Sequence, residues 1–537
     1  MKYLLAIVFA VGILLFALAC ALEPEESPAA GTDTGKTETS ISAATPATGT
    51  ASETDTDRMP ETATDASGRA DAAETEEQTT QEETTEEETT VDDWVDETVP
   101  VTAKEEAKVS DSAAFGDEAR NGPIGILTCS PRASWEEFLA AQESGDALSE
   151  AFYRRNLEVA DRMQCRLTIT SVTGSGSGSV MYEILRRDLL AASCDYEIAY
   201  GPQEPMTDLF KLHALWNLDE FEDFDPTASR WSTGYLEESS YAGGHYMVTG
   251  KGALSAYRNL NVTLVDRTLL QAKDGKTLFD TVKNGEWTLD TMQALLLENL
   301  PADTDAFSLP DPGVYRVPYD GFLRAFGMRF LTHSQDGVLE VADFDVKQID
   351  LVQERFLSFR NQSGVRMDKE SEDEVLAHLA NGQVRATCNV LGVLEEPLFV
   401  DRNAEFVALP IPKLTAQQTE YGVTFAKGVR VYGILSTAPG LERLALAFHV
   451  MDALCSRTEE TVVPVYLAEL FGEDAAQKDL ISGMVSMVSP DPIAVYLPNE
   501  QFSAADLMQG GKASSYVTRR KRQLLKEVSN LNKRYER

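Results

Sequence analysis

Apolar and polar positions follow two alternating periods after the first quarter of the chain. Short apolar runs at residues 124–129, 166–172 and 196–200 predict buried strands, whereas residues 147–163 and 180–192 carry apolar positions at helical spacing. Strand and helix alternation at this spacing favours βαβ units around a parallel sheet. We therefore expect an α/β fold.

Ligands of open parallel sheets lie beyond the carboxyl ends of the strands. Two segments occupy such positions, the Gly/Ser loop 174–179 and the turn 200–204. The loop lacks the Lys-Ser/Thr ending of a P-loop and the glycine spacing of a dinucleotide fingerprint, so we do not expect a nucleotide. Its hydroxyls and the polar side chains of the turn suit a hydroxylated ligand, which makes five residues candidates for ligand binding: Ser175, Ser177, Ser179, Gln203 and Glu204.

The start of the chain has a different pattern. Lys2 is followed by an apolar run from Leu4 to Ala19 and then by Cys20. A basic start and a short apolar run that ends in a small residue are typical of a secretory signal, here residues 1–19. The cysteine that follows resembles the lipidated cysteine of bacterial lipoproteins, although Ala17 stands where those signals favour Leu. The alternatives are an ordinary secretory signal and a short membrane span. A membrane-spanning helix needs about 20 apolar residues, and this run is shorter.

An acidic segment follows the signal. From Glu23 to Pro100 there are 23 acidic and 3 basic residues, about half of the chain's net charge of −40. Such a Thr/Glu-rich composition cannot bury a core, and we expect residues 20–117 to form a disordered tether. A glycosylated stalk is the alternative. The acidity therefore belongs largely to the tether and not to a binding face.

The remaining residues, 118–537, suffice for two globular lobes. Five cysteines lie here, and their odd number and wide spacing predict neither a disulfide framework nor a CxxC metal site. The five histidines are scattered and form no HExxH motif. We assign no metal and no cofactor.

Three segments carry a resemblance to a known family. They are Phe279–Asp290 (FDTVKNGEWTLD), Leu409–Lys413 (LPIPK) with Gln417–Tyr421 (QQTEY), and Phe224–Pro226 (FDP) with Trp231. Together they resemble the sugar-binding type (family 1) of extracellular solute-binding proteins of ABC transporters, found as lipoproteins in Gram-positive bacteria. Two departures stand out: Trp231 has no second Trp beside it, and Arg258-Asn259-Leu260 replaces a common Phe-Asn-Lys.

The resemblance implies a two-lobed, periplasmic-binding-protein-like (type II) fold with a hinge. We expect lobe 1 at about 118–235 plus a later returning segment, lobe 2 at about 236–400, and C-terminal helices at about 436–537. The implied function is to capture a solute, a carbohydrate or oligosaccharide, by lobe closure and to deliver it to membrane permease subunits. The chain would act as a monomer on the extracellular face of the cell membrane, and we expect no nucleic acid among its partners.

Sugars are commonly bound by aromatic rings. Candidate rings are Trp231, Tyr235, Tyr241, Tyr315 and Tyr319. Each of them alone is more commonly a core residue. We assign Trp287 to structure, with Thr288 capping a helix at 289–297, and Pro410 and Pro412 to a turn or hinge.

Two other functions stay open. A surface-anchored glycoside hydrolase would need a carboxylate pair, which the many acidic residues permit, although no GxSxG motif occurs and we assign no catalytic residue. A sensor or adhesin without a transporter would share the fold and the cleft. We expect a binding protein and not an enzyme.

The last segment, 519–537, combines eight Lys/Arg with Leu524, Leu525, Val528 and Leu531 at helical spacing. We expect an amphipathic helix whose apolar stripe docks on a lobe while its charges face solvent.

Overall fold

The computed structural model describes residues 107–116, 121–139, 145–270, 277–343, 345–367, 370–400, 402, 405–508 and 511–535. The expected signal peptide, Cys20 and the tether up to residue 106 lie outside the described residues. Within them, no helix is both long enough and apolar enough to cross a bilayer.

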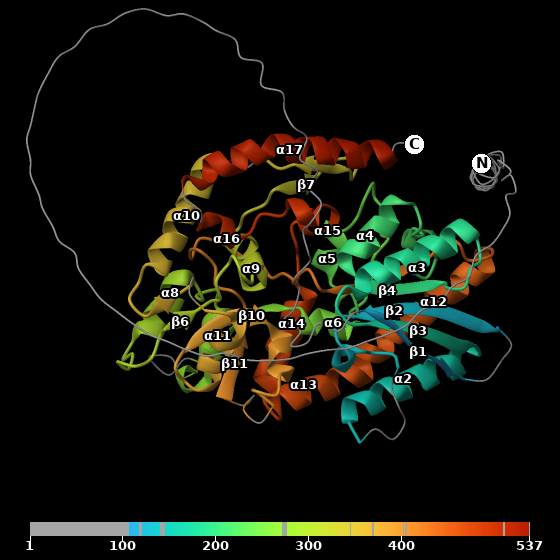
Figure 1. Cartoon of the computed structure of the whole chain (residues 1–537), viewed down its shortest axis with the longest axis horizontal. Coiled ribbons are helices and arrows are strands. Elements are labelled where there is room, and N and C mark those ends of the chain that lie inside the picture. Colours follow the sequence, from blue (N-terminus) through green and yellow to red (C-terminus); the bar gives the residue numbers. More distant parts are fainter. Residues whose placement is uncertain are drawn as a thin grey trace, which may run out of the picture. The chain divides into compact units, whose positions relative to one another are not determined.

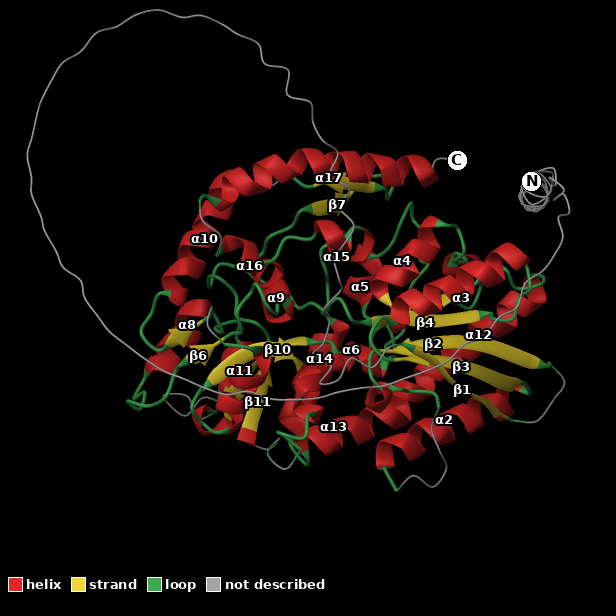
Figure 2. Ribbon diagram, in the orientation of Figure 1, coloured by secondary structure: helices red, strands yellow, loops and turns green. Residues whose placement is uncertain are grey.

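The first lobe is built on a five-stranded sheet with the order β1-β3-β2-β4-β12 (Figures 1 and 2). The parallel strands β2, β3 and β4 form its centre, and β1 and β12 pair antiparallel at the two edges. The strands are β1 (Lys108–Phe115), β2 (Pro123–Ser130), β3 (Arg166–Thr173), β4 (Ile198–Pro202) and β12 (Arg430–Ile434).

Helices cover both faces of this sheet. The chain moves from β2 to β3 in one direction and from β3 to β4 in the other, so right-handed crossovers place successive helices on opposite faces. One face carries α3 (Ser177–Ala191) and α4 (Gln203–Lys211), and the other carries α2 (Ala147–Met163) and α12 (Leu441–Arg457) (Figure 1). The central strand β2 is therefore buried at every position after Pro123.

The second lobe has a smaller sheet of order β10-β5-β11, in which both outer strands run antiparallel to β5. Two short pairs, β6 with β9 and β7 with β8, lie outside it. The strands are β5 (Asn261–Asp266), β6 (Phe307–Ser308), β7 (Leu331–His333), β8 (Leu339–Val341), β9 (Val365–Arg366), β10 (Ala386–Val390) and β11 (Phe406–Leu409). The helices are α7 (Leu278–Lys283), α8 (Leu289–Leu297), α9 (Val317–Ala325), α10 (Val346–Arg360) and α11 (Glu372–Ala380).

Two crossing segments join the lobes side by side. The outgoing chain runs from α6 (Leu254–Arg258) into β5, and the returning chain leads to β12. They pair antiparallel: Asn261 N–H donates to the carbonyl of Thr424 over 3.0 Å, and Ala426 N–H donates to the carbonyl of Asn259 over 2.8 Å. This is the α/β, two-lobed, type II periplasmic-binding-protein-like fold, with the paired crossings in the position of a hinge.

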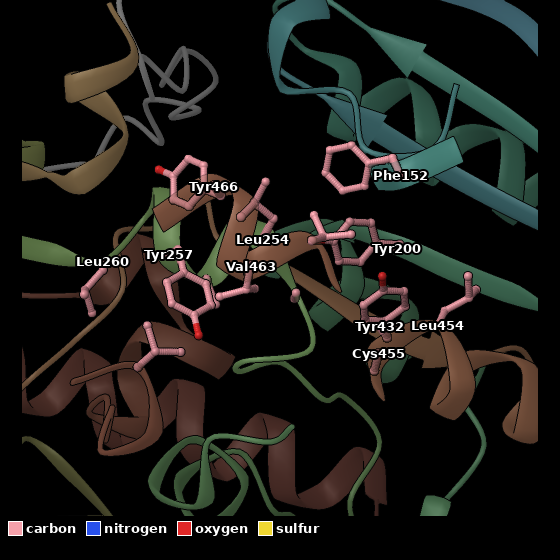
Figure 3. Close-up of a cluster of buried hydrophobic side chains, with 14 of the residues drawn as sticks. Phe152, Tyr200, Leu254, Tyr257, Leu260, Tyr432, Leu454, Cys455, Val463 and Tyr466 are labelled. Atoms are coloured by element: carbon pink, nitrogen blue, oxygen red, sulfur yellow. The ribbon is translucent and has the colours of Figure 1, made fainter. Parts of the chain in front are cut away.

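The hydrophobic core of the first lobe continues into this crossing. Tyr200 of β4 stacks on Tyr432 of β12 with ring centroids 4.1 Å apart. Figure 3 shows these rings in one cluster with Tyr257 and Leu260 of the outgoing crossing and Tyr466 of α13 (Val463–Phe471). The crossing is therefore packed on the sheet of the first lobe and is not a free linker.

The C-terminal helices reach both lobes. They are α13, α14 (Ala475–Ser486), α15 (Pro492–Tyr496), α16 (Ala504–Leu507) and α17 (Ala513–Tyr535). The short helix α5 (Thr233–Glu238) comes earlier in the chain and belongs to the first lobe. Helix α17 begins on α10, where Ala513 N–H donates to Gln353 Oε1 over 2.8 Å, and ends on α4 (Figure 1). The expected docking is confirmed for Leu524, Val528 and Leu531, which are buried, and is wrong for the exposed Leu525.

Several predicted boundaries need correction. Residues 108–115 form the edge strand β1 and do not belong to the tether, which was expected to reach 117, because the buried Phe115 anchors them to the sheet. The first lobe continues beyond 235, since Val248 still pairs with Tyr432 of β12. The second lobe continues beyond 400, because β11 completes its sheet.

Candidate binding pocket

A pocket of about 270 Å³ lies between the lobes and takes lining residues from both. The first lobe contributes residues that follow β2. The second lobe contributes the segment before α9, the first turns of α11 and the stretch after β10. The lining residues are Arg132, Trp135, Tyr315, Glu372, Asp373, Leu376, Val390, Val393, Glu396, Pro397 and Leu398.

The segment after β2 is held in place by its own side chains. Ser130 Oγ donates to the carbonyl of Arg132 over 2.8 Å. The carboxylate of Glu136 accepts the backbone N–H groups of Glu137 and Phe138 at 3.0 and 2.8 Å. These bonds fix the short 3₁₀ turn Ala133–Trp135 (η1), so Trp135 enters the pocket wall from a rigid loop.

Beneath Trp135 lies a buried ionic network that joins the lobes. The Arg430 guanidinium of β12 forms an ion pair with Glu137 and donates to the Trp135 carbonyl over 2.9 Å. Arg258, at the outgoing crossing, lies 4.0 Å from Glu137 and donates to Glu395 of the second lobe over 2.9 Å. Buried charges are tolerated only when paired, and here the pairing ties the pocket floor to the crossing.

A second contact between the lobes involves Trp135. The guanidinium of Arg132 lies 4.4 Å from the centre of the Trp135 ring and forms an ion pair with Glu396 of the second lobe. Gly392 of the second lobe also packs against the Trp135 ring, so closely that an added Cβ would lie 2.8 Å from Trp135 Cζ2. Trp135 is therefore clamped between a charge pair and backbone of the second lobe.

The polar wall of the pocket centres on Glu372, in the first turn of α11. Its Oε1 accepts from Asn389 Nδ2 over 2.8 Å, while Oε2 is buried without a partner of good hydrogen-bond geometry among the described residues. Burial raises the pKa of this carboxyl to about 7, against opposing contributions from Asn389 and the nearby Tyr315 hydroxyl. The capping box of α11 uses Ser371 and Glu374 instead, which leaves Glu372 to the pocket.

Of the candidates from sequence, Tyr315 lies in the pocket wall. Gln203 and Tyr235 lie together elsewhere: the buried Tyr235 hydroxyl donates to Gln203 Oε1, and Gln203 Nε2 donates to Thr207 over 3.1 Å. Glu204 accepts from Asn499 over 3.1 Å. These two polar residues join α4 to its neighbours and are not among the residues that line the pocket.

The other candidates lie in the core or at the Gly/Ser loop. Tyr319 is fully buried, and its hydroxyl oxygen lies 2.7 Å from the carbonyl oxygens of both Pro310 and Met367, either of which can accept its single hydrogen. Tyr241 is fully buried and donates to Asn532 over 2.8 Å, and Trp231 is buried beside Arg230. In the loop, Ser177 is buried, and Ser175 and Ser179 are exposed. A ligand contact at any of these residues stays a prediction.

The pocket residues before α2 had a signal in the sequence. The strand order places β2 between β3 and β4, and the crevice of an open sheet lies where the strand order reverses. Arg132 and Trp135 directly follow β2, whereas the loop candidates from sequence follow the second and third predicted strands. Glu372 and Glu396 had no comparable signal, because their position depends on how the second lobe folds.

The described residues contain no group of three His, Cys, Asp or Glu side chains arranged to hold a metal ion. Their five cysteines are all free thiols. The pocket lining combines carboxyl and guanidinium groups with aromatic and aliphatic side chains.

Comparison of the fold with solved structures finds sugar-binding proteins at low identity. The sugar-binding protein MalE from the phytopathogen Xanthomonas citri has 11% identity and a TM-score of 0.48, with 77% of this chain and 98% of that chain covered. The GacH receptor of Streptomyces glaucescens, solved unliganded and with acarbose, has 12% identity and a TM-score of 0.45, with 75% and 98% covered. A family 1 extracellular solute-binding protein from Bifidobacterium longum subsp. infantis has 12% identity and a TM-score of 0.44, with 74% of this chain and 99% of that chain covered. No family model and no curated protein sequence matches the chain.

Proposed function

We propose that the chain is an extracellular solute-binding protein that captures a sugar between its two lobes and delivers it to an ABC importer. The observation that carries this proposal is the pocket itself, which takes its walls from both lobes beside a paired crossing. Rotation about such a crossing would open the pocket for entry and close it around a ligand. The motifs around Trp287 and Pro410 add the resemblance to transport receptors.

The lining supports a carbohydrate as the ligand. Trp135 and Tyr315 offer aromatic surface, and Glu372, Asp373 and Glu396 offer oxygen acceptors for hydroxyl groups. The volume of about 270 Å³ is just below the range of roughly 300–1,000 Å³ for small-molecule sites. Among the carbohydrates and oligosaccharides that the resemblance implies, one or two sugar rings suit this volume best.

Calorimetry and thermal-shift measurements on the full chain test this function. We expect a neutral mono- or disaccharide to raise the unfolding midpoint of the wild type and of an Arg154→Ala control, an exposed site on α2. The increase should shrink in Arg132→Ala, which loses the ion pair to Glu396. A peptide that raises the midpoint where no sugar does would refute the carbohydrate assignment.

We further propose that Cys20 carries a lipid that anchors the chain to the outer face of the cell membrane, with residues 20–106 as the tether. The support is the sequence around Cys20 and the acidic composition that follows it. A Cys20→Ser variant should appear in the culture medium. Retention of that variant in the membrane fraction would overturn the anchor.

One observation favours a second candidate, a glycoside hydrolase. Glu372 has a pKa of about 7 and shares the pocket with other carboxyl groups, an arrangement that general acid catalysis uses. Release of reducing sugar from glycans by the wild type, with loss of release in Glu372→Gln, would establish the enzyme and exclude the receptor.

A further inference from the structure

The pocket wall holds one carboxylate oxygen that the protein itself does not satisfy. Glu372 is only 5% exposed, and its Oε2 has no hydrogen-bond partner of good geometry among the described residues. The Tyr315 hydroxyl is near enough to lower the pKa of this carboxyl but does not complete such a bond. Because buried polar atoms are almost always hydrogen-bonded, an unsatisfied oxygen in a pocket wall indicates a partner that comes from outside the chain.

Asn389 determines which oxygen of Glu372 is left for that partner. Its Oδ1 accepts the backbone N–H of Val390 over 2.8 Å, so its Nδ2 is turned toward Glu372 and donates to Oε1 over 2.8 Å. The N–H donor holds Oε1 as an acceptor, and Oε2 is therefore the oxygen that carries a proton or receives a hydrogen from a ligand. A ligand would reach it when the two lobes open.

The charges around Glu372 favour a cation as the partner. Burial raises its pKa most, and the neighbouring carboxyl groups of Asp373 and Glu396 raise it further. Arg132 is the one Lys or Arg among the lining residues that the structure describes, and it is already paired with Glu396. A buried carboxylate is unfavourable unless it is paired, so a positively charged group on the ligand suits this wall better than a neutral one.

We propose that the ligand is an amino sugar and that Glu372 Oε2 binds its ammonium group. The proposal rests on the proposed function, since it takes the ligand to be a carbohydrate, and it names the class of sugar. An ammonium group brings three N–H donors and a positive charge, whereas a hydroxyl brings one donor and no charge. Charge-assisted hydrogen bonds are about twice as strong as neutral ones. Glu372 would therefore distinguish an amino sugar from the parent sugar that has a hydroxyl at the same carbon.

Calorimetric titration of the full chain with matched sugars tests the proposal. Glucosamine, galactosamine, mannosamine and the chitosan disaccharide are each compared with the neutral parent sugar and with the N-acetylated form, which keeps the nitrogen but not the charge. At pH 7 we expect at least one amine to bind about tenfold more tightly than both of its neutral counterparts. Neutral sugars that bind as well as every amine would overturn the proposal and leave the sugar receptor standing. Binding of no sugar at all would overturn the proposed function as well.

Proton release gives a second readout, which needs no variant. Glu372 has a pKa of about 7 and is mostly protonated at pH 6 in the free chain, whereas an ion pair with an ammonium group requires the carboxylate. Binding of an amino sugar at pH 6 should therefore release roughly 0.9 proton per ligand, and binding of its neutral parent none. Calorimetry in two buffers of different ionisation enthalpy measures the release. Equal release with the amine and with its parent would contradict the proposal.

Glu372→Gln is the matched variant, because it keeps the size of the side chain and an oxygen for Asn389 while it removes the charge. Both the preference for the amine and the proton release should disappear. Glu183→Gln removes an exposed carboxylate of α3 that is not among the lining residues, and it should keep both. Circular dichroism checks that the variants are folded, and the proton release of the wild type decides if Glu372→Gln is not. A folded Glu372→Gln protein that still prefers the amine would refute the proposal.

A polyamine is the competing cation for this carboxylate. Spermidine, which has amines but no sugar ring, is titrated beside the sugars at pH 6. Proton release with spermidine and with none of the amino sugars would assign Glu372 to a polyamine and refute the proposal. Release with an amino sugar that depends on Glu372, and none with spermidine, would support it.

Discussion

Tyr535 lies flat against Phe210, 325 positions earlier in the chain. The ring centroids are 4.3 Å apart with planes at 14°, and the Tyr535 hydroxyl donates to the Phe210 carbonyl over 2.7 Å. Phe210 belongs to α4 of the first lobe, whereas the start of α17 bonds to Gln353 of the second. The last described helix therefore connects both lobes in addition to the crossing segments.

Neighbouring leucines of α17 should differ sharply in their effect on stability. Leu524 is 1% exposed and Leu525 is 50% exposed. We expect Leu524→Ala to lower the free energy of unfolding by about 2–5 kcal/mol, since it leaves a cavity, and Leu525→Ala to change it by less than about 0.5 kcal/mol. Denaturant unfolding measures both, and similar losses would show that α17 is not docked by this face.

Removal of Arg430 should leave the buried Glu137 carboxylate without its closest ion-pair partner. Arg430→Met leaves Glu137 with the Tyr200 hydroxyl at 3.1 Å and with Arg258 at 4.0 Å. Breaking a buried ion pair from one side costs about 3–5 kcal/mol. Arg186→Met, which breaks an exposed pair with Glu183, should cost at most about 0.5 kcal/mol. The network has no structural importance if chemical denaturation shows equal losses in the two variants.

Glu372 should make the chain less stable as pH rises. Its folded pKa of about 7 exceeds the ordinary 4.5. Below about pH 4 both states are protonated, and between the two pKa values only the unfolded state ionises, so stability is lost up to about pH 7. Glu372→Gln should therefore gain up to roughly 3 kcal/mol over the wild type at pH 8 and nothing at pH 4.

Glu374 provides the control for this titration, with the opposite sign. The Ser371 N–H and hydroxyl that it accepts lower its pKa, so its contribution is present above the ordinary pKa and is lost as pH falls. Glu374→Gln should reduce the thermal midpoint at pH 8. A gain in both variants at pH 8 would contradict the assignment of Glu372.

Two glycine substitutions should act in opposite directions. A Cβ at Gly392 would meet Trp135 Cζ2 at 2.8 Å and the Arg258 carbonyl at 3.0 Å, so Gly392→Ala should destabilise the chain and weaken ligand binding. Gly483 lies inside α14 with nothing within 4 Å of its Cβ position. Gly483→Ala should stabilise by about 0.4–1 kcal/mol. Thermal midpoints of the two variants test the pair together, and a stabilised Gly392→Ala would be incompatible with the packing of Trp135.

Local chemistry made part of the fold predictable from sequence. The helix at 147–163 has the expected bounds, and Thr288 caps the helix Leu289–Leu297 as expected, with its Oγ1 accepting from Thr291 N–H. Trp287 is structural, since its Nε1 donates to the Pro410 carbonyl over 2.8 Å. Each of these depends on residues near one another or on a strong periodic pattern.

The parts that failed depend on distant partners. Among the side chains of β1 that the structure describes, only Phe115 is buried, so the pattern of this strand resembles that of the acidic segment before it. The pocket brings Arg132 to Glu396, residues 264 positions apart, and no local spacing encodes that pair. Aromatic residues such as Tyr319 and Tyr241 could not be sorted by sequence, because a ring in a core and a ring in a ligand site have the same composition.

The position of β12 also sets the order of folding. Its partner β4 precedes it by about 230 residues, so at 5–20 residues per second that edge of the first sheet waits roughly 10–45 s during synthesis for its last strand. An open edge of this kind is a site of aggregation. In the cell, the first lobe would therefore depend on chaperones, or on export before folding, until the whole second lobe has been made.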